Sequence, residues 1–434
     1  MTESRLPSTS IFRPKPVKIS AALLRQRKRW DRIFYLLGKS AVIFSCLILL
    51  GILGSIVYWA FPAFISVELK IVVPVQNIHN LPSHLKENRS ITLQKSLHAT
   101  YPTLTKKSEY RAAQNLYSLL AQKKIMHALK EAFKSSQNLP QTIPLWIKAS
   151  PDVATFLKHN KLSSSVKNQS FRLTEFQQTL LNSMEQDGSI RFRFNTEFFT
   201  FSDSQTPELA GIYGAFIGSL YVLAIALLFS LPIGVLTAIY LEEFARDSRL
   251  NRFLEINLNN LAAVPSVVFG LLGLSVFLNF FKLPRSSALI GGLTLGLMLF
   301  PIIIVSSRSA LRSIPPSLRD AARGLGASPL QVIFHHVLPL SFPGILTGSL
   351  IATARAMGES ASLLMVGMMA FLTIPPHTIL SPTTTLPIEI YQWVERPERG
   401  FDELSSAAIL FLLVLLGIVN WTALFLKRKF EKKW

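Results

Sequence analysis

Long apolar runs alternate with polar stretches along this chain. Five runs carry no charged side chain and reach the roughly 18 residues that a membrane-spanning helix needs: Ala41–Phe61, Gly211–Leu241, Asn257–Phe281, Ser286–Ser307 and Leu404–Leu426. A sixth run, Pro343–Phe371, is equally long but contains Arg355 and Glu359. The pattern predicts an all-α polytopic membrane protein with six transmembrane helices.

The segment Pro62–Leu209 contains no long apolar run and indicates a separate α+β domain inserted after the first span. VELKIVVPV and TIPLWI have the residue pattern of strands, and SIRFRF with EFFTF predicts a hairpin across Asn195–Thr196. Helical spacing is present in YRAAQNLYSLLAQKKIMHALKEAF and in FRLTEFQQTLLNSMEQDG, which ends at Asp187–Gly188.

Composition and charge favour a membrane protein. Hydrophobic residues make up 49% of the chain and charged residues 16%, against about 25% charged in an ordinary soluble domain. The net charge of +20 is concentrated near both ends, in LLRQRKRWDR and KRKFEKKW. Because cytoplasmic segments beside spans accumulate Lys and Arg, we expect both termini in the cytoplasm. We expect membrane lipid as a partner and no nucleic acid.

These features divide the chain into five parts: a basic cytoplasmic tail (1–40), a first span (41–61), an extracytoplasmic α+β domain (62–209), a five-span core (210–426) and a second basic tail (427–434). The longest cytoplasmic loop of the core is 308–342.

Two stretches resemble ligand sites but lack the necessary residues. LGKS resembles the end of a phosphate-binding P-loop, but Ile33 stands where that motif requires glycine, so no nucleotide site is expected. His335 and His336 are adjacent, so on a helix they point about 100° apart, and no further ligand set lies near them. We therefore expect no metal and no cofactor.

The cytoplasmic loop contains the most specific pattern, IPPSLRDAARGLGASPLQVIFHHVLPLSFPGIL. Pro315 and Pro316 end any preceding helix, and Ser317 with Asp320 predicts a capping-box start for a short helix. Gly326 suits the left-handed position that ends such a helix.

A second helix is predicted directly afterwards. Ser328 caps it, Pro329 occupies its first position, and Pro339 ends it before the chain re-enters the membrane. A bent helical pair of this kind is suited to docking into a groove of a partner protein.

The spacing of Asp320-Ala321-Ala322, Gly326 and Leu338-Pro339 resembles the EAA loop of permease subunits in binding-protein-dependent ABC importers. In that family the loop is the coupling helix received by the ATPase subunit. Asp320 replaces the usual Glu, and His336 replaces an aliphatic residue. The resemblance implies a type I ABC importer permease core and assigns ATPase coupling to Asp320, Ala321, Ala322, Leu325, Gly326, Leu338 and Pro339.

Further stretches narrow the resemblance. NLAAVPSVVFGLLGLSVF and GILTGSLIATARAMGESASLL look like the PstA family, the permease subunits of the high-affinity phosphate importer, and the N-terminal half resembles the extension of its longer members. This resemblance implies a transport subunit rather than an enzyme, with ATP hydrolysis in a partner chain. The implied partners are an ATPase subunit dimer, a second homologous permease subunit and an extracytoplasmic phosphate-binding protein.

Arg355 and Glu359 are four residues apart, hence on one face of a continuous helix, near the middle of the predicted span. A lone Arg there costs at least about 2.5–3.5 kcal/mol, so a partner or a watery cavity is expected. In one interpretation the two residues pair as a structural ion pair. In the other they line the substrate path, where a guanidinium matches phosphate oxygens and the family's RAxGETA stretch is implicated in transport.

Ser266, after Pro265, is a third candidate for the substrate path, with bonding to its own helix backbone as the alternative. Two other functions remain open: a permease for another oxyanion, and a membrane sensor that signals through its outer domain. A sensor would have no use for an ATPase-docking bend.

Overall fold

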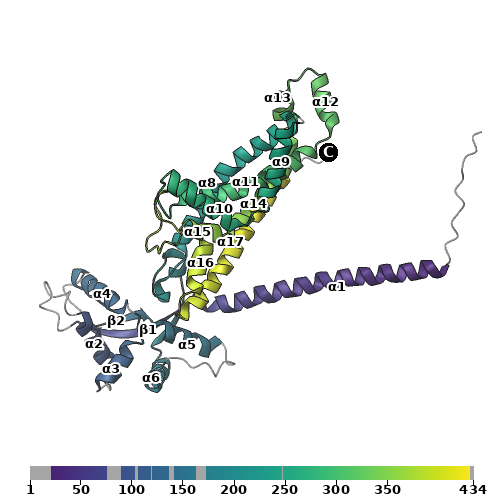
Figure 1. Ribbon diagram of the computed structural model, residues 1–434. Helices are drawn as coiled ribbons and strands as arrows, with labels where there is room; N and C mark the ends of the chain where they lie inside the picture. Colours follow the sequence, from purple (N-terminus) through teal and green to yellow (C-terminus); the bar gives the residue numbers. More distant parts are fainter. Residues whose placement is uncertain are drawn as a thin grey trace, which may run out of the picture. The chain divides into compact units, whose positions relative to one another are not determined.

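The computed structural model describes residues 21–75, 89–102, 106–118, 120–135, 141–162, 173–246 and 248–430, and Figure 1 labels its helices and strands. The chain divides into two compact units, Met1–Ser55 and Ile56–Trp434. Helix α1 (Ala21–Ala60) leads into a 3₁₀ turn, η1 (Phe61–Phe64), so the predicted first span forms the apolar second half of a longer helix.

A three-stranded antiparallel sheet follows. Its order is β2 (Thr142–Lys148), β1 (Ile65–Pro74), β3 (Ile190–Phe194). Leu69 of the central strand pairs with Ile147 of β2 and Ile190 of β3. Alternate residues of β1 are at most 2% exposed and form the core, namely Val67, Leu69, Ile71 and Val73. The two predicted strands VELKIVVPV and TIPLWI are confirmed.

Five helices share this core: α2 (Arg89–Thr100), α3 (Lys107–Gln114), α4 (Ala121–Ser135), α5 (Pro151–Leu162) and α6 (Glu175–Gln186). The end of α6 is as predicted, with Gly188 at φ 67°. The single helix predicted across α3 and α4 is wrong, because Tyr117 forms a β-bridge with Ala149 between them.

The predicted hairpin across Asn195–Thr196 is also wrong. Residues 197–200 form a helical turn, α7 (Glu197–Thr200), and β3 pairs with β1 instead. The turn buries Phe198 completely, while Asn195 donates from its side chain to the carbonyl oxygen of Ala63 at 3.0 Å. Burial of this aromatic ring therefore outweighs the local strand preference of the sequence.

The remaining chain forms a helical bundle. Its long helices run alongside one another (Figure 1): α8 (Tyr213–Ile239), α11 (Ala288–Arg312), α14 (Leu338–Met357) and α17 (Gly400–Phe430). Glycines permit close packing of α8 on α11. A Cβ atom at Gly234 would lie 2.8 Å from Ile303, and one at Gly292 would lie 2.5 Å from Ile225. Small residues at helix interfaces are typical of membrane bundles.

Five helical stretches of the described residues are long and apolar enough to cross a membrane, or six if one bent pair counts as a span. The five are Gln26–Phe64, Tyr213–Phe244, Ala288–Arg312, Pro329–Met357 and Gly400–Lys429. Shorter elements are η2 (Pro207–Leu209) and α16 (Leu386–Val394). The predicted fold class, a polytopic helical protein with an inserted α+β domain, is confirmed.

The predicted span Asn257–Phe281 is interrupted at Pro265. It is a pair bent by 107°, made of α9 (Arg249–Leu261) and of α10 (Ser266–Gly273) with its π-helical continuation η4 (Leu274–Phe280). The break lies at Pro265, whose ψ of 140° is extended. A residue before proline is also disfavoured in helical conformation.

The predicted span Pro343–Phe371 ends early as well. Helix α14 stops at Met357, Gly358 follows as its C-cap, and a short helix α15 (Ala361–Met365) begins after the break. Glu359 lies in the break, where its carboxylate accepts a hydrogen bond from the Ser362 amide at 3.1 Å. Arg355 is therefore in the last turn of a helix, not in the middle of one.

Candidate functional site

The loop 308–342 forms a bent helical pair. Helix α12 (Pro316–Gly324) is followed by Gly326 at φ 87°, and α13 (Pro329–Gln331) starts the next helical stretch. The predicted left-handed glycine and the second helix start are confirmed. Ser328 and Gln331 form a capping box in which the Ser328 amide donates to the Gln331 side chain at 2.9 Å.

Two predictions about this loop are wrong. Ser317 and Asp320 form no capping box, because the helix already begins at Pro316, with Pro315 as its N-cap. Pro339 does not end a helix. A π-helical turn, η5 (Val332–Val337), leads directly into α14, whose second residue is Pro339. Proline inside a continuous helical stretch removes one backbone hydrogen bond. The π-helical turn directly before it, in which the Leu338 amide donates to the Ile333 carbonyl oxygen, is a local adjustment of the kind that accommodates such a proline.

The bent pair has a buried face and an exposed apolar tip. Ala322 is 7% exposed and packs in one cluster with Val332, Ile333 and Leu311. In contrast, Leu325 is 90% exposed, and the side chains of Leu330 and Phe334 are also exposed. Of the other predicted coupling residues, Asp320, Ala321, Gly326 and Pro339 are exposed and Leu338 is half-buried.

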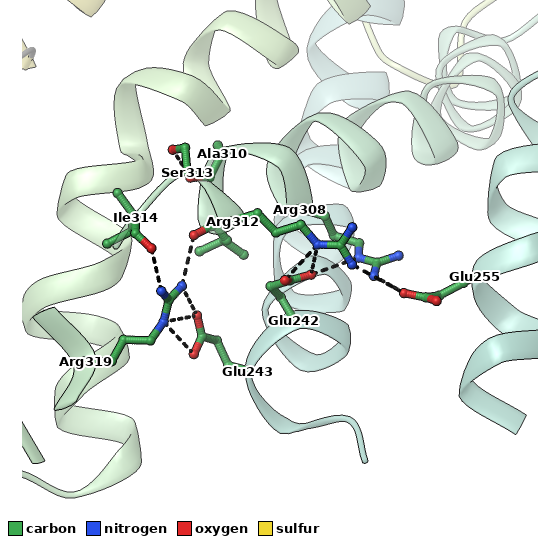
Figure 2. Close-up of polar contacts among 10 residues, drawn as sticks. Glu242, Glu243, Glu255, Arg308, Ala310, Arg312, Ser313, Ile314 and Arg319 are labelled. Carbon is green, nitrogen blue, oxygen red and sulfur yellow. Dashed lines mark hydrogen bonds and ion pairs between the residues drawn. The ribbon is translucent and has the colours of Figure 1, made fainter. Parts of the chain in front are cut away.

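An ion-pair cluster at the C-terminal end of α8 was missed from the sequence (Figure 2). Glu242 lies in a π-helical turn, η3 (Tyr240–Phe244), and accepts hydrogen bonds from Arg312 at 2.8 and 2.9 Å. Arg308, which is 9% exposed, bridges Glu242 at 3.4 Å and Glu255 of α9. We call these four residues the Glu242 cluster; it ties α8, α9 and α11 together.

The adjacent residue Glu243 pairs with a residue of α12 instead. Its carboxylate accepts from Arg319 at 2.8, 3.1 and 3.3 Å. The same guanidinium donates to the carbonyl oxygens of Ile314 at 2.7 Å and Leu311 at 2.9 Å (Figure 2). The sequence does show the doublet Glu242–Glu243 on a short polar loop. However, no nearby sequence pattern indicates which basic residues pair with the two glutamates.

Arg355 and Glu359 form no ion pair with each other in the part of the chain that the structure describes. The helix break separates them, Arg355 is exposed, and the carboxylate of Glu359 caps the start of α15. Glu359 also borders a small pocket of about 30 Å³ that is lined mainly by apolar side chains such as Leu223 and Leu363. A pocket of this volume holds a water molecule only where its lining is polar, so this one offers no evident water site beside the break.

Ser266 is the first residue of α10 and is half-buried. Within the described ranges its hydroxyl has no hydrogen-bond partner, and at the first helical position no helical carbonyl precedes it by four residues. Helix α10 packs closely on α15, since a Cβ at Gly270 would lie 2.6 Å from the Ser362 carbonyl oxygen. The elements that carry Ser266, Glu359 and Arg355 are thus neighbours.

Comparison with known proteins identifies the family of this chain. A family model described as "Binding-protein-dependent transport system inner membrane component" matches residues 230–432, and one described as "Domain of unknown function (DUF3333)" matches residues 21–167. The phosphate transport system permease protein PstA of Haemophilus influenzae is 34% identical over 54% of this chain and 82% of its own length. The chain belongs to the PstA family.

A second curated relative agrees with this membership. PstA 1 of Mycobacterium tuberculosis (strain ATCC 25618 / H37Rv) is 31% identical over 49% of this chain and 68% of its own length. A solved structure of the inward-facing MetNI methionine ABC transporter is 19% identical, covers 51% of this chain and 98% of its own, and has a TM-score of 0.42. As a PstA-family permease with several apolar helices, the chain is a multi-pass inner-membrane protein and a transport subunit.

Proposed function

We propose that this chain is the permease subunit of an ATP-driven importer of inorganic phosphate. It would form the translocation path with a second homologous permease subunit and be driven by a separate ATPase subunit dimer. An extracytoplasmic phosphate-binding protein would deliver the substrate. The substrate class rests on relatives such as the H. influenzae protein, a permease of the phosphate transport system.

The observation that carries the coupling part of this proposal is the exposed apolar tip of the bent helical pair. The side chains of Leu325, Leu330 and Phe334 are exposed. The opposite face of the same loop packs against the bundle and is joined to it by an ion pair. Apolar anchors on a rigid support are the usual centre of a protein interface. An ATPase groove that covers these side chains would remove them from water.

The path part of the proposal rests on Arg355. Its guanidinium is exposed in this subunit and has no ion-pair partner among the described residues. Facing a second permease subunit, it would meet a passing oxyanion through a fork that matches phosphate oxygens. Glu359 would accept a hydrogen bond from protonated phosphate and repel a fully deprotonated anion such as sulfate, and the free hydroxyl of Ser266 would add a donor.

In this mechanism, closure of the ATPase dimer moves the bent pair Pro316–Leu338. The movement tilts the spans and exposes the Arg355 region first to one side of the membrane and then to the other. The proposal includes the topology: both termini in the cytoplasm and the α+β domain 62–209 outside it, so that the loop 308–342 faces the ATPase.

The coupling part is tested by Leu325→Glu, with Leu250→Glu, an exposed leucine on α9, as the matched control. We expect the Leu325 variant to recover at least about fivefold less ATPase in co-purification, because truncating or charging an interface anchor costs about 1 kcal/mol or more and about 1.4 kcal/mol is tenfold. The Leu250 variant should behave as wild type. Equal ATPase recovery by all three chains would contradict the docking role.

A further inference from the structure

Arg319 joins three elements through one side chain. It belongs to α12, pairs with Glu243 at the end of α8, and donates to the carbonyl oxygens of Leu311 and Ile314 at the end of α11. A helix leaves its last carbonyl groups without helical partners, so the guanidinium satisfies groups that α11 itself cannot. Arg319 and Glu243 are buried, with side chains 14% and 6% exposed.

We infer that the Arg319–Glu243 pair transmits movement of α12 to α8 and α11, whereas the Glu242 cluster is a fixed clamp between the spans. This inference rests on the proposed function, because it takes α12 to be the element that an ATPase moves. It adds two positioning residues, Arg319 and Glu243, that act through α12.

The two glutamates of the doublet contact different helices. Glu242 and Glu243 are neighbours in the π-helical turn, yet among the described residues Glu242 pairs only with Arg308 and Arg312 of α11, while Glu243 pairs with Arg319 of α12. Of the ion pairs between described residues, Arg319–Glu243 is the only one that connects α12 to a span. π-helical turns are frequent at functional sites.

The remaining contacts of α12 are of a different kind. Ala322 packs among apolar residues such as Leu311 and Val332, and apolar contacts are not directional, so they allow the helix to slide and rotate. A guanidinium bound side-on to a carboxylate fixes distance and angle together. The pair therefore sets the orientation of α12 relative to both spans.

Adjacent residues of α12 point in different directions, about 100° apart. Arg319 points into the bundle, whereas the next residue, Asp320, is exposed, and its only ion pair with a described residue is with Arg323, at 3.7 Å. An ATPase that pushes on Asp320 would therefore act on the residue directly next to Arg319, which is bonded to the bundle. Transmission through this pair needs no contact between the ATPase and the spans.

The test compares Arg319→Lys with Arg312→Lys in the full complex, reconstituted in vesicles with the ATPase and the phosphate-loaded binding protein. Both arginines pair with a glutamate of the doublet, but only Arg319 reaches α12, and lysine keeps the charge while losing the fork. We expect Arg319→Lys to lower phosphate imported per ATP hydrolysed by at least about fivefold, the lower end of site-to-site coupling effects. Arg312→Lys should leave that ratio unchanged.

The ratio separates transmission from stability, since a merely structural role would lower the amount of complex and not the ratio. If Arg319→Lys does not assemble, Glu243→Gln is measured instead, with the same loss expected. A wild-type ratio in an assembled Arg319 or Glu243 variant, or an equal loss in Arg312→Lys, would overturn the inference. A wild-type complex that imports no phosphate would instead overturn the proposed function.

Discussion

A buried acidic pair lies outside the spans, beside the start of α8. Asp203 accepts hydrogen bonds from the Trp393 indole at 2.9 Å and from Arg396 at 2.5 and 3.1 Å. Glu389 is fully buried, and no donor among the described residues reaches its carboxylate oxygens. Burial first, and then the charge of Asp203, raises the pKa of Glu389 well above its usual value, although Arg396 opposes the shift. A proton on Glu389 would be donated to Asp203.

This shift predicts a pH dependence of stability. Because the pKa of Glu389 is raised in the folded state, its contribution is fully present below the ordinary carboxyl pKa and is lost as pH rises through the raised pKa. Glu389→Gln should remove this decline, so that its melting temperature in detergent changes less between pH 5 and about 8 than that of wild type. Glu398→Gln, an exposed control, should keep the decline. Parallel curves for wild type and Glu389→Gln would contradict this account.

At the scale of elements, the bend after α12 depends on one backbone conformation. Gly326 has φ 87° and Gly324 does not have a positive φ, while a Cβ at either position meets nothing within 4 Å. The two glycines therefore differ in conformation and not in available space.

Gly326→Ala should destabilise the bend by roughly 1–2 kcal/mol, the cost of placing an L-residue in the left-handed region. Gly324→Ala should be neutral or slightly stabilising, because alanine is favoured over glycine in a helix. Protease susceptibility of the loop, compared in the two variants, checks this pair. Equal susceptibility would show that the conformation at residue 326 does not hold the bend.

Sequence patterns predicted elements well where one physical rule dominates. Bilayer thickness sets the length of an apolar helix, so the spans around α8, α11 and α17 were placed correctly. The breaks at Pro265 and after Met357 were not predicted, because hydropathy is insensitive to a local change of backbone direction. The helical turn at Phe198 was missed because its burial depends on residues distant in the chain.

The candidate site, like the fold, was predicted in part from the sequence. Arg355 stood out as a charge in an apolar run, and the bent loop followed from Gly326 and Ser328. The ion pairs of Glu242 and Glu243 join residues 66 to 76 positions apart in sequence, and no local pattern specifies such partners. The expected i,i+4 relation of Arg355 and Glu359 failed because Gly358 ends the helix between them.

At the scale of the molecule, the α+β domain is firmly attached to the bundle within the second unit. Lys158 of α5 pairs with Glu403, in the first turn of α17, at 2.8 Å, with side chains 10% and 7% exposed. Inside the domain, Lys148 of β2 pairs with Glu197 and donates to the Glu208 carbonyl oxygen at 2.6 Å, which fixes the sheet to the segment that leads into α8. Breaking a buried ion pair leaves an uncompensated charge at a cost of about 3–5 kcal/mol, so domain and bundle should move together.

The central claim is that this permease moves phosphate past Arg355 under the control of a docked ATPase. The most direct test is labelled-phosphate uptake by cells carrying wild type or Arg355→Ala, with ATPase assembly checked by pull-down. We predict saturable uptake by wild type and a loss of at least about tenfold in the variant, as for a lost bidentate charged contact, with the complex intact. Unchanged uptake by an assembled Arg355→Ala complex would contradict the claim.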